Sequence, residues 1–131
     1  MSNPNIAAAS NIYGTTTFYT PSGTSAVVLL ANATGSNTVY KINQIVAANV
    51  NGSSAVNTTV SIYSNGGVAQ GSAPSGGTAY PIVSTVSVPA NASLIAADKT
   101  TAIYLMENQS ITVTSGTGSG ITYSVSYEAI S

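Results

Sequence analysis

The sequence predicts an all-β fold: a single antiparallel β-sandwich, jelly-roll-like and of about eight strands, with an extended N-terminal arm. Short runs of β-branched and aromatic residues recur at fairly even intervals, and clusters of Gly, Asn, Ser and Pro separate them. No stretch carries the apolar period of a helix longer than a turn or two. The 131 residues have the length of one domain. We therefore expect an arm over residues 1–11 and a β-sandwich domain over residues 12–131.

The C-terminal stretch, residues 102–131, carries the clearest strand pattern. It predicts three successive strands, at 103–105, 111–113 and 121–130, with a polar turn at 107–109 and a glycine-rich hairpin at 116–120. Apolar and polar side chains alternate in the last strand, as they do in a half-buried antiparallel strand. Its apolar face holds Ile121, Tyr123, Val125, Tyr127 and Ala129. We expect Tyr123 and Tyr127 to pack in the core.

Further strands are expected at 12–20, 25–31, 38–50, 57–63, 80–88 and 93–97. Strand 25–31 is apolar on both faces. It is therefore expected to be central in a sheet or covered on its outer side, which suggests a subunit contact or a strand that crosses between sheets. Strand 80–88 is expected to turn Ile82, Val86 and Val88 inward.

Strand 38–50 is long enough to suggest a bend or a bulge. Apart from Gln44, alternation assigns one face of it to Tyr40, Ile42, Val46, Ala48 and Val50. The following Asn51-Gly52 predicts a hairpin that pairs this strand with 57–63. In that second strand Val60 and Ile62 are expected inward, and Tyr63 outward.

Two segments are irregular. Residues 68–79 are rich in Gly, Ser and Pro, and a loop of this length is either disordered or a contact loop in an assembly. Residues 1–11 form either a frayed terminus or an arm that reaches over a neighbouring subunit.

Charged residues are unusually rare. They make up 4% of the chain, whereas an ordinary domain has about 25%; they are Lys41, Asp98, Lys99, Glu107 and Glu128. Two basic residues cannot form the basic surface that binds nucleic acid or an anionic membrane, so neither partner is expected. The charges that usually protect exposed strand edges are also missing. The edges are therefore expected to be closed into a barrel, covered by loops, or paired in an oligomer.

The composition also argues against catalysis. There is no His and no Cys, so we expect no enzyme activity, no cofactor, no metal site and no disulfide. Glu107 and Glu128 are better explained as solvated surface groups than as a glycosidase pair, and Asp98-Lys99 as a solvated loop. No signal peptide and no membrane-spanning run is present, so synthesis in the cytoplasm is expected.

Several short stretches carry a family likeness. They are MSNPNI at residues 1–6, IYG at 12–14, VPA at 88–90, DKTTAIYL at 98–105 and YEAIS at 127–131. Together they resemble the small virion structural proteins of tailed phages that infect cyanobacteria and other marine bacteria, and the likeness spans most of the chain. The turn after the Ile-Tyr-Leu strand departs from the pattern. It is typically acidic with a Gly and here reads Met106-Glu107-Asn108-Gln109, which puts any contact shared through that turn in doubt.

The resemblance implies a capsid decoration or cement protein that stabilises the shell of the virion. Such a subunit is expected to form a homotrimer and to bind the major capsid protein. The expected assembly contacts lie in the arm and near the glycine-rich loop: Asn3, Pro4, Asn5, Ile6, Val68, Gln70, Pro74 and Tyr80. The alternative is a tail or fibre module that binds host-surface glycan in a cleft lined by Tyr19, Tyr63 and Tyr80.

Overall fold

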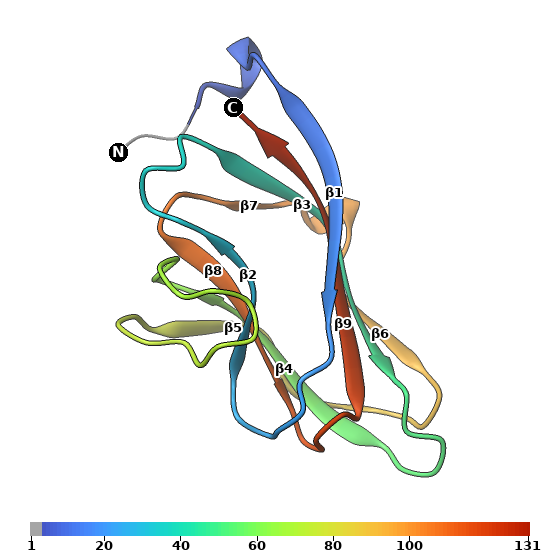
Figure 1. The fold of residues 1–131 in the computed structure, drawn as a ribbon. Helices are drawn as coiled ribbons and strands as arrows, with labels where there is room; N and C mark the ends of the chain where they lie inside the picture. The colour runs from blue at the N-terminus through green and yellow to red at the C-terminus, as the bar shows by residue number, and fades with distance from the viewer. Residues whose placement is uncertain (1–3) are drawn as a thin grey trace.

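The computed structural model describes residues 4–131, which form two antiparallel sheets packed face to face (Figure 1). Sheet A has the order β1-β9-β3-β6, with β7 also paired to β3, and sheet B has the order β2-β8-β4-β5. The strands of sheet A are β1 (Ile12–Tyr19), β9 (Ile121–Ile130), β3 (Val39–Asn49), β6 (Ser93–Ala97) and β7 (Ile103–Leu105). Those of sheet B are β2 (Val27–Asn32), β8 (Gln109–Ser115), β4 (Val56–Tyr63) and β5 (Ala79–Val88).

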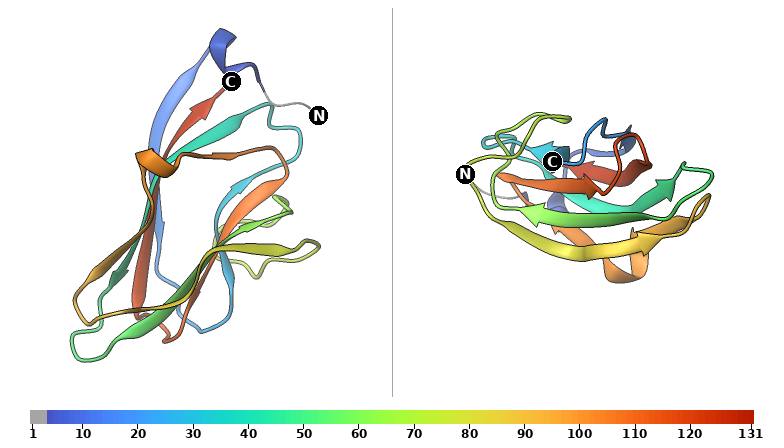
Figure 2. Two further views of the ribbon diagram at one scale, coloured as in Figure 1. Left: turned by 180° about the vertical axis from the view of Figure 1, so that it is seen from behind. Right: turned by 90° about the horizontal axis from the view of Figure 1, so that it is seen from below.

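This order is that of a jelly roll. β6 and β7 both pair with β3 and are separated only by a 3-10 turn, η2 (Lys99–Thr101), so they act as one interrupted strand. The chain then passes to the opposite sheet after every strand except β4, which is followed by its own neighbour β5 (Figure 2). Two four-stranded sheets linked in this way make the eight-stranded jelly roll. The predicted fold class is confirmed.

The two predicted hairpins are wrong. The segment that contains Asn51-Gly52 connects β3 in sheet A to β4 in sheet B, and residues 116–120 connect β8 in sheet B to β9 in sheet A. β3 pairs instead with β9, while β4 pairs with β8 and β5. Turn residues show where a chain reverses, but the partner of each strand depends on burying an apolar face against the opposite sheet.

A bulge in β3 was expected and is present, and it changes the face that each residue occupies. The register with β9 shifts between Ile42 and Gln44, which leaves Asn43 as the extra residue. One extra residue reverses the alternation of every side chain beyond it. The buried residues after the bulge are therefore Ile45, Ala47 and Asn49. The prediction that Val46, Ala48 and Val50 share a face with Tyr40 and Ile42 is wrong.

A similar irregularity displaces part of β5. Thr85 has a φ of +50°, and the register with β4 shifts opposite Thr58 and Val60. As a result Val83 packs against the core whereas Val86 is exposed, so the inward assignment of Val86 is wrong. On the partner strand Tyr63 turns away from the core as expected, and it is buried because the glycine-rich loop covers this face, with Gly77 against its ring.

The core lies between the sheets and is built from both. Its largest fully buried side chains include Leu29, Ile42, Ile45, Leu105, Ile111, Ile121 and Tyr123. Tyr123 is buried as expected, and its hydroxyl donates to Thr114 O at 2.9 Å and is hydrogen-bonded to Thr58 Oγ1. Tyr127 is half-buried, with its ring centroid 4.8 Å from that of Tyr40.

The glycine-rich loop covers the open edge of β2. Val28 N–H donates to Ser72 O at 3.0 Å, and Gly71 N–H donates to Val28 O at 2.8 Å. This cover explains the apolar residues on both faces of β2, an edge strand whose Val28 and Leu29 are fully buried. The loop therefore makes its backbone contacts within the chain.

The described part of the arm is tied to the C-terminus. A short 3-10 turn, η1 (Ile6–Ala8), precedes Asn11, whose backbone exchanges two hydrogen bonds of 2.9 Å with Ser131. Sheet A extends beyond sheet B at the end of the molecule where these two segments lie (Figure 1). Within residues 4–131, no helix is long and apolar enough to cross a membrane.

Candidate functional site

The predicted contact residues do not form one surface. Asn3 lies outside the described residues. In the arm, Asn5 caps η1 by accepting a hydrogen bond from Ala7 N–H at 3.0 Å, and Pro4 and Ile6 lie beside it. The loop residues lie elsewhere, over the edge of β2 (Figure 1).

The loop residues contribute mainly to the fold. Gln70 Nε2 donates to Leu29 O at 2.8 Å and to Thr17 Oγ1 at 3.0 Å, and so ties the loop to both sheets. Val68 and Pro74 are partly buried in the same loop. Tyr80, on β5, has 61% of its surface exposed.

The three tyrosines of the alternative reading do not line a cleft. Tyr63 is buried, and its hydroxyl accepts a hydrogen bond from Gly77 N–H at 3.0 Å. Tyr19 lies under the glycine-rich loop, where a Cβ added to Gly71 would approach its ring to 3.2 Å. Tyr80 alone is exposed, so the predicted cleft is not formed.

The carboxylates have structural partners. Glu107 is only 5% exposed, and its Oε2 accepts a hydrogen bond from Asn37 N–H at 2.9 Å, which fixes the turn before β3. The prediction of a solvated Glu107 is wrong. Asp98 caps η2, and hydrogen bonds from the side chain and the backbone of Thr100 hold the pKa of Asp98 below its usual value.

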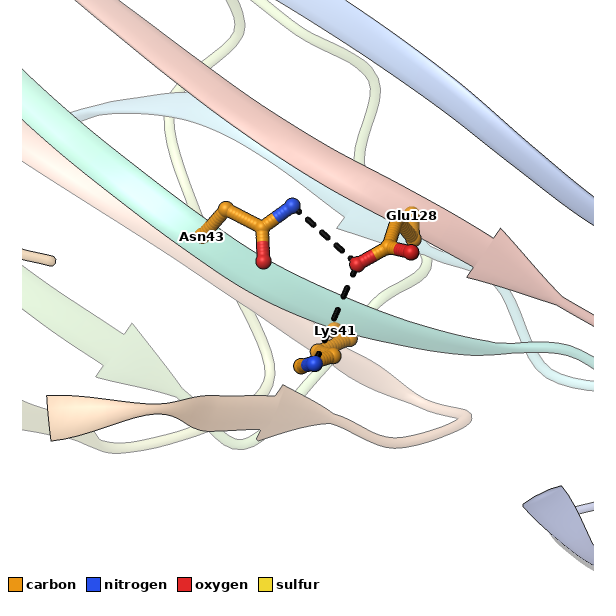
Figure 3. A network of polar contacts seen from close by, with 3 residues as sticks. All are labelled: Lys41, Asn43 and Glu128. Atoms are coloured by element: carbon orange, nitrogen blue, oxygen red, sulfur yellow. Dashed lines mark hydrogen bonds and ion pairs between the residues drawn. The ribbon is translucent and has the colours of Figure 1, made fainter. Parts of the chain in front are cut away.

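Glu128 belongs to a small polar network on the outer face of sheet A (Figure 3). Asn43 Nδ2 donates to Glu128 Oε2 at 3.2 Å, and Lys41 Nζ lies 4.0 Å from the same oxygen. Lys41 and Glu128 are direct cross-strand partners in the β3–β9 pairing. The bulge places Asn43 within reach of Glu128 as well.

A groove with a volume of about 410 Å³ lies beside this network. We call it the outer groove; it is lined by Asn43, Gln44, Asp98, Lys99, Thr100 and Ser126. Four of the five charged side chains thus lie in or next to it. Sequence reasoning missed this site because its residues come from β3, β9 and the η2 region, which only the tertiary fold brings together.

The groove offers amide, hydroxyl and ammonium groups for hydrogen bonding. Asn43 Oδ1 is buried and has no hydrogen-bond partner within residues 4–131. A buried acceptor without a donor is costly, so this oxygen favours a ligand that brings a hydroxyl or amide donor. Residues 4–131 contain no group of three or more acidic side chains that could hold a metal ion.

Exposed apolar side chains lie on the same outer face of sheet A. The pairing aligns Phe18, Ser124, Val46 and Ile95 in one row across β1, β9, β3 and β6. Phe18 is 70% exposed and Ile95 is 55% exposed. Tyr104 on β7, the partner of Lys41, adds a further exposed ring. We call Phe18, Val46, Ile95 and Tyr104 the outer apolar residues.

Comparison with known proteins identifies no relative: no protein-family model matches the chain, and no curated protein is significantly similar to it in sequence.

Proposed function

We propose that this chain is a non-enzymatic virion structural protein, a capsid decoration or cement protein that stabilises the shell through protein contacts. The observation that supports this role best is the set of outer apolar residues, which spans the width of sheet A. Aromatic side chains are enriched in protein interfaces and charged ones are depleted at their centres. The outer face carries both features, apart from the polar network at Lys41 and Glu128.

The expected partners follow from the same proposal. The major capsid protein would cover the outer apolar residues, and copies of the chain would associate on the shell, as a homotrimer if the family resemblance holds. The protein would be made in the host cytoplasm and would reside in the virion. A stable contact of this kind buries roughly 1,200 to 2,000 Å² in total.

A binding assay with capsid shells that lack the protein tests this role. The purified chain should sediment with the shells, and Ile95→Ser should weaken binding by at least about tenfold, the cost of losing a buried apolar side chain at an interface. Val50→Ser is the matched control, because Val50 is an equally exposed apolar residue outside the outer row. Failure of the unmodified chain to bind, or equal losses in both variants, would contradict the proposal.

A tail or fibre module that binds host-surface glycan is the second candidate. The outer groove supports this role, and it replaces the tyrosine cleft as the proposed binding site. The unsatisfied Asn43 Oδ1 and the neighbouring Gln44, Thr100 and Ser126 match the hydroxyl groups of a sugar. Binding on a glycan array that is lost with Asn43→Ala but kept with Tyr80→Ala would support it. No binding to any glycan or to host envelopes would exclude it.

A further inference from the structure

Strand β1 leaves one edge of sheet A unpaired. Asn11 and Ser131 exchange hydrogen bonds in both directions, which sets the phase of the β1–β9 ladder. Because bonded and non-bonded pairs alternate in an antiparallel ladder, every second residue from Tyr13 onward bonds to β9. The residues between them turn N–H and C=O away from β9: Ile12, Gly14, Thr16 and Phe18. No backbone group within residues 4–131 pairs with this edge.

The other sheet edges are protected. The β2 edge is covered by the glycine-rich loop. The β5 edge contains Pro81, which has no N–H to donate, and the irregular Thr85. The remaining edge of sheet A is interrupted between β6 and β7 by η2, with Asp98 and Lys99 at the break.

None of these devices is found on β1. Its register with β9 is continuous from Ile12 to Tyr19, and the strand has no charged residue and no Pro. Its edge residues Ile12 and Phe18 are 58% and 70% exposed. A long, regular, uncharged edge is a template for pairing with another strand.

We propose that β1 pairs with β1 of a second copy of this chain, antiparallel and about a two-fold axis beside Thr15. One register uses all the free backbone groups: Ile12 opposite Phe18 and Gly14 opposite Thr16, each pair occurring twice and exchanging two hydrogen bonds. A shift of two residues in either direction leaves free groups without partners. The two A sheets then form one continuous sheet.

The same register also matches the side chains. On the outer face, Phe18 of each copy lies against Ile12 of the other, and aromatic and β-branched residues form favourable cross-strand pairs. On the inner face, Tyr13 lies opposite Thr17, and Thr15 lies opposite its own copy. Tyr13 is on the inner side yet 63% exposed, because sheet A extends beyond sheet B at that end (Figure 1). Because β1 carries no charged residue, the pairing brings no like charges together.

This pairing does not depend on the proposed function. The dimer would form in solution whatever the outer face binds. A two-fold contact gives a dimer or an even-numbered assembly, so a trimer would require a different interface. Ile95, the residue chosen for the capsid test, lies on the opposite edge of sheet A, so the two experiments can fail separately.

Single cysteines test the register, because the chain has none of its own. Thr15→Cys places two thiols in a directly opposed, non-hydrogen-bonded pair, about 4.5 Å apart at Cα, which lies within the range of a disulfide. Thr17→Cys is the matched control, because two copies of residue 17 are offset along the strands by about 13 Å. Under mild oxidation Thr15→Cys should form a covalent dimer at least about tenfold faster than Thr17→Cys. Equal rates, or faster dimerisation of Thr17→Cys, would overturn the proposal.

Analytical ultracentrifugation tests the dimer without a cross-link. The unmodified chain should sediment as a dimer or an even-numbered assembly. Phe18→Lys places a charge on the β1 edge and should halve the mass of the sedimenting assembly, whereas Ile95→Lys on the other edge of sheet A should not. Circular dichroism should show both variants folded. A monomeric or trimeric unmodified chain, or an assembly that Phe18→Lys leaves unchanged, would overturn the proposal.

Discussion

At the scale of single residues, two buried asparagines hold the loops at opposite ends of the sandwich. Asn32 Nδ2 donates to Thr38 O at 2.8 Å and to Leu105 O at 3.0 Å. Asn49 Nδ2 donates in the same way to Ser54 O and Val88 O, at 3.0 and 2.9 Å. Each side chain thus satisfies carbonyl groups from segments distant in the sequence, where jelly-roll connections cross between sheets.

The role of Asn32 can be tested by replacing its amide with a carboxylate. Asn32→Asp keeps the shape and still accepts from Ser36 Oγ, but its carboxylate cannot donate to the two carbonyl oxygens. We expect the free energy of unfolding, measured in urea, to fall by about 3 kcal/mol or more, because a buried charge then faces unpaired acceptors. Asn57→Asp on exposed β4 surface is the control. Equal losses in both variants would show that Asn32 has no such role.

Tyr123 should make the protein sensitive to alkaline pH. Burial raises the pKa of Tyr123 to about 12, with a smaller opposing effect from the hydrogen bond to Thr58. The neutral phenol therefore stabilises the fold fully below pH 10, the ordinary pKa of tyrosine. Above that pH the unfolded chain loses this proton first, and stability should fall by up to about 1.4 kcal/mol per pH unit until pH 12. The free energy of unfolding, measured in urea at several pH values, should therefore fall more steeply with pH over this window for the unmodified chain than for Tyr123→Phe. The same pH dependence in both proteins would contradict the assignment.

At the scale of elements, close approach of backbones controls which substitutions a connection accepts. Gly66 lies between β4 and β5, and a Cβ added to it would be 2.2 Å from Asn32 O and 2.8 Å from Gln109 O. These atoms belong to the adjoining ends of β2 and β8, which cannot move without breaking their pairing. Glycine is therefore required here by packing.

A pair of glycine variants tests this requirement. Gly66→Ala should destabilise the protein by about 3 kcal/mol, or prevent folding, because backbone must move to accept the methyl group. Gly14→Ala on β1 should be neutral or slightly stabilising, because no atom lies within 4 Å of its added Cβ and alanine restricts the unfolded chain. Thermal unfolding of both variants gives the comparison. A tolerated Gly66→Ala would show that this connection is more adaptable than its geometry implies.

The strands also show where sequence patterns are reliable. β9 keeps a continuous register with β1, and Ile121, Tyr123 and Val125, which the pattern assigns to the core, are fully buried. β3 and β5 contain register shifts, and the assignments fail beyond them, at Val46 and Val86. A bulge was inferred from the length of strand 38–50, but its position at Asn43 was not. Because the side-chain period is two, an error of one residue in that position reverses a whole face.

At the scale of the whole molecule, nearly all strand pairs join distant parts of the chain. Only β4 and β5 are both consecutive and paired, whereas β1 and β9 pair the two ends of the sequence, from Ile12 opposite Ile130 to Tyr19 opposite Tyr123. Closing the loop between β1 and β9 costs about 2 kcal/mol more in conformational entropy than closing the loop between β4 and β5. Folding should therefore be slow, and the β4–β5 pair should form before the β1–β9 pair.

Pulsed hydrogen exchange during refolding tests the order. Amides in the β4–β5 pair, such as that of Val60, should be protected before those of Thr15 and Thr17 on β1. The main refolding phase should take milliseconds to seconds, as in other sandwiches dominated by non-local pairs. Protection of β1 before β4, or at the same time, would mean that the termini meet early in folding.

The sequence by itself determined the class of the fold, the positions of the strands, the bulge in β3 and the core role of Tyr123, because strand propensity, turn residues and period-two alternation are local properties. It also indicated that the strand edges need protection. Tertiary structure alone decided the partner of each strand, the burial of Asn32, Asn49 and Glu107, and the gathering of the charged groups around the outer groove. These features depend on which distant segments share a sheet, and that choice follows from burying two apolar faces together rather than from any local pattern.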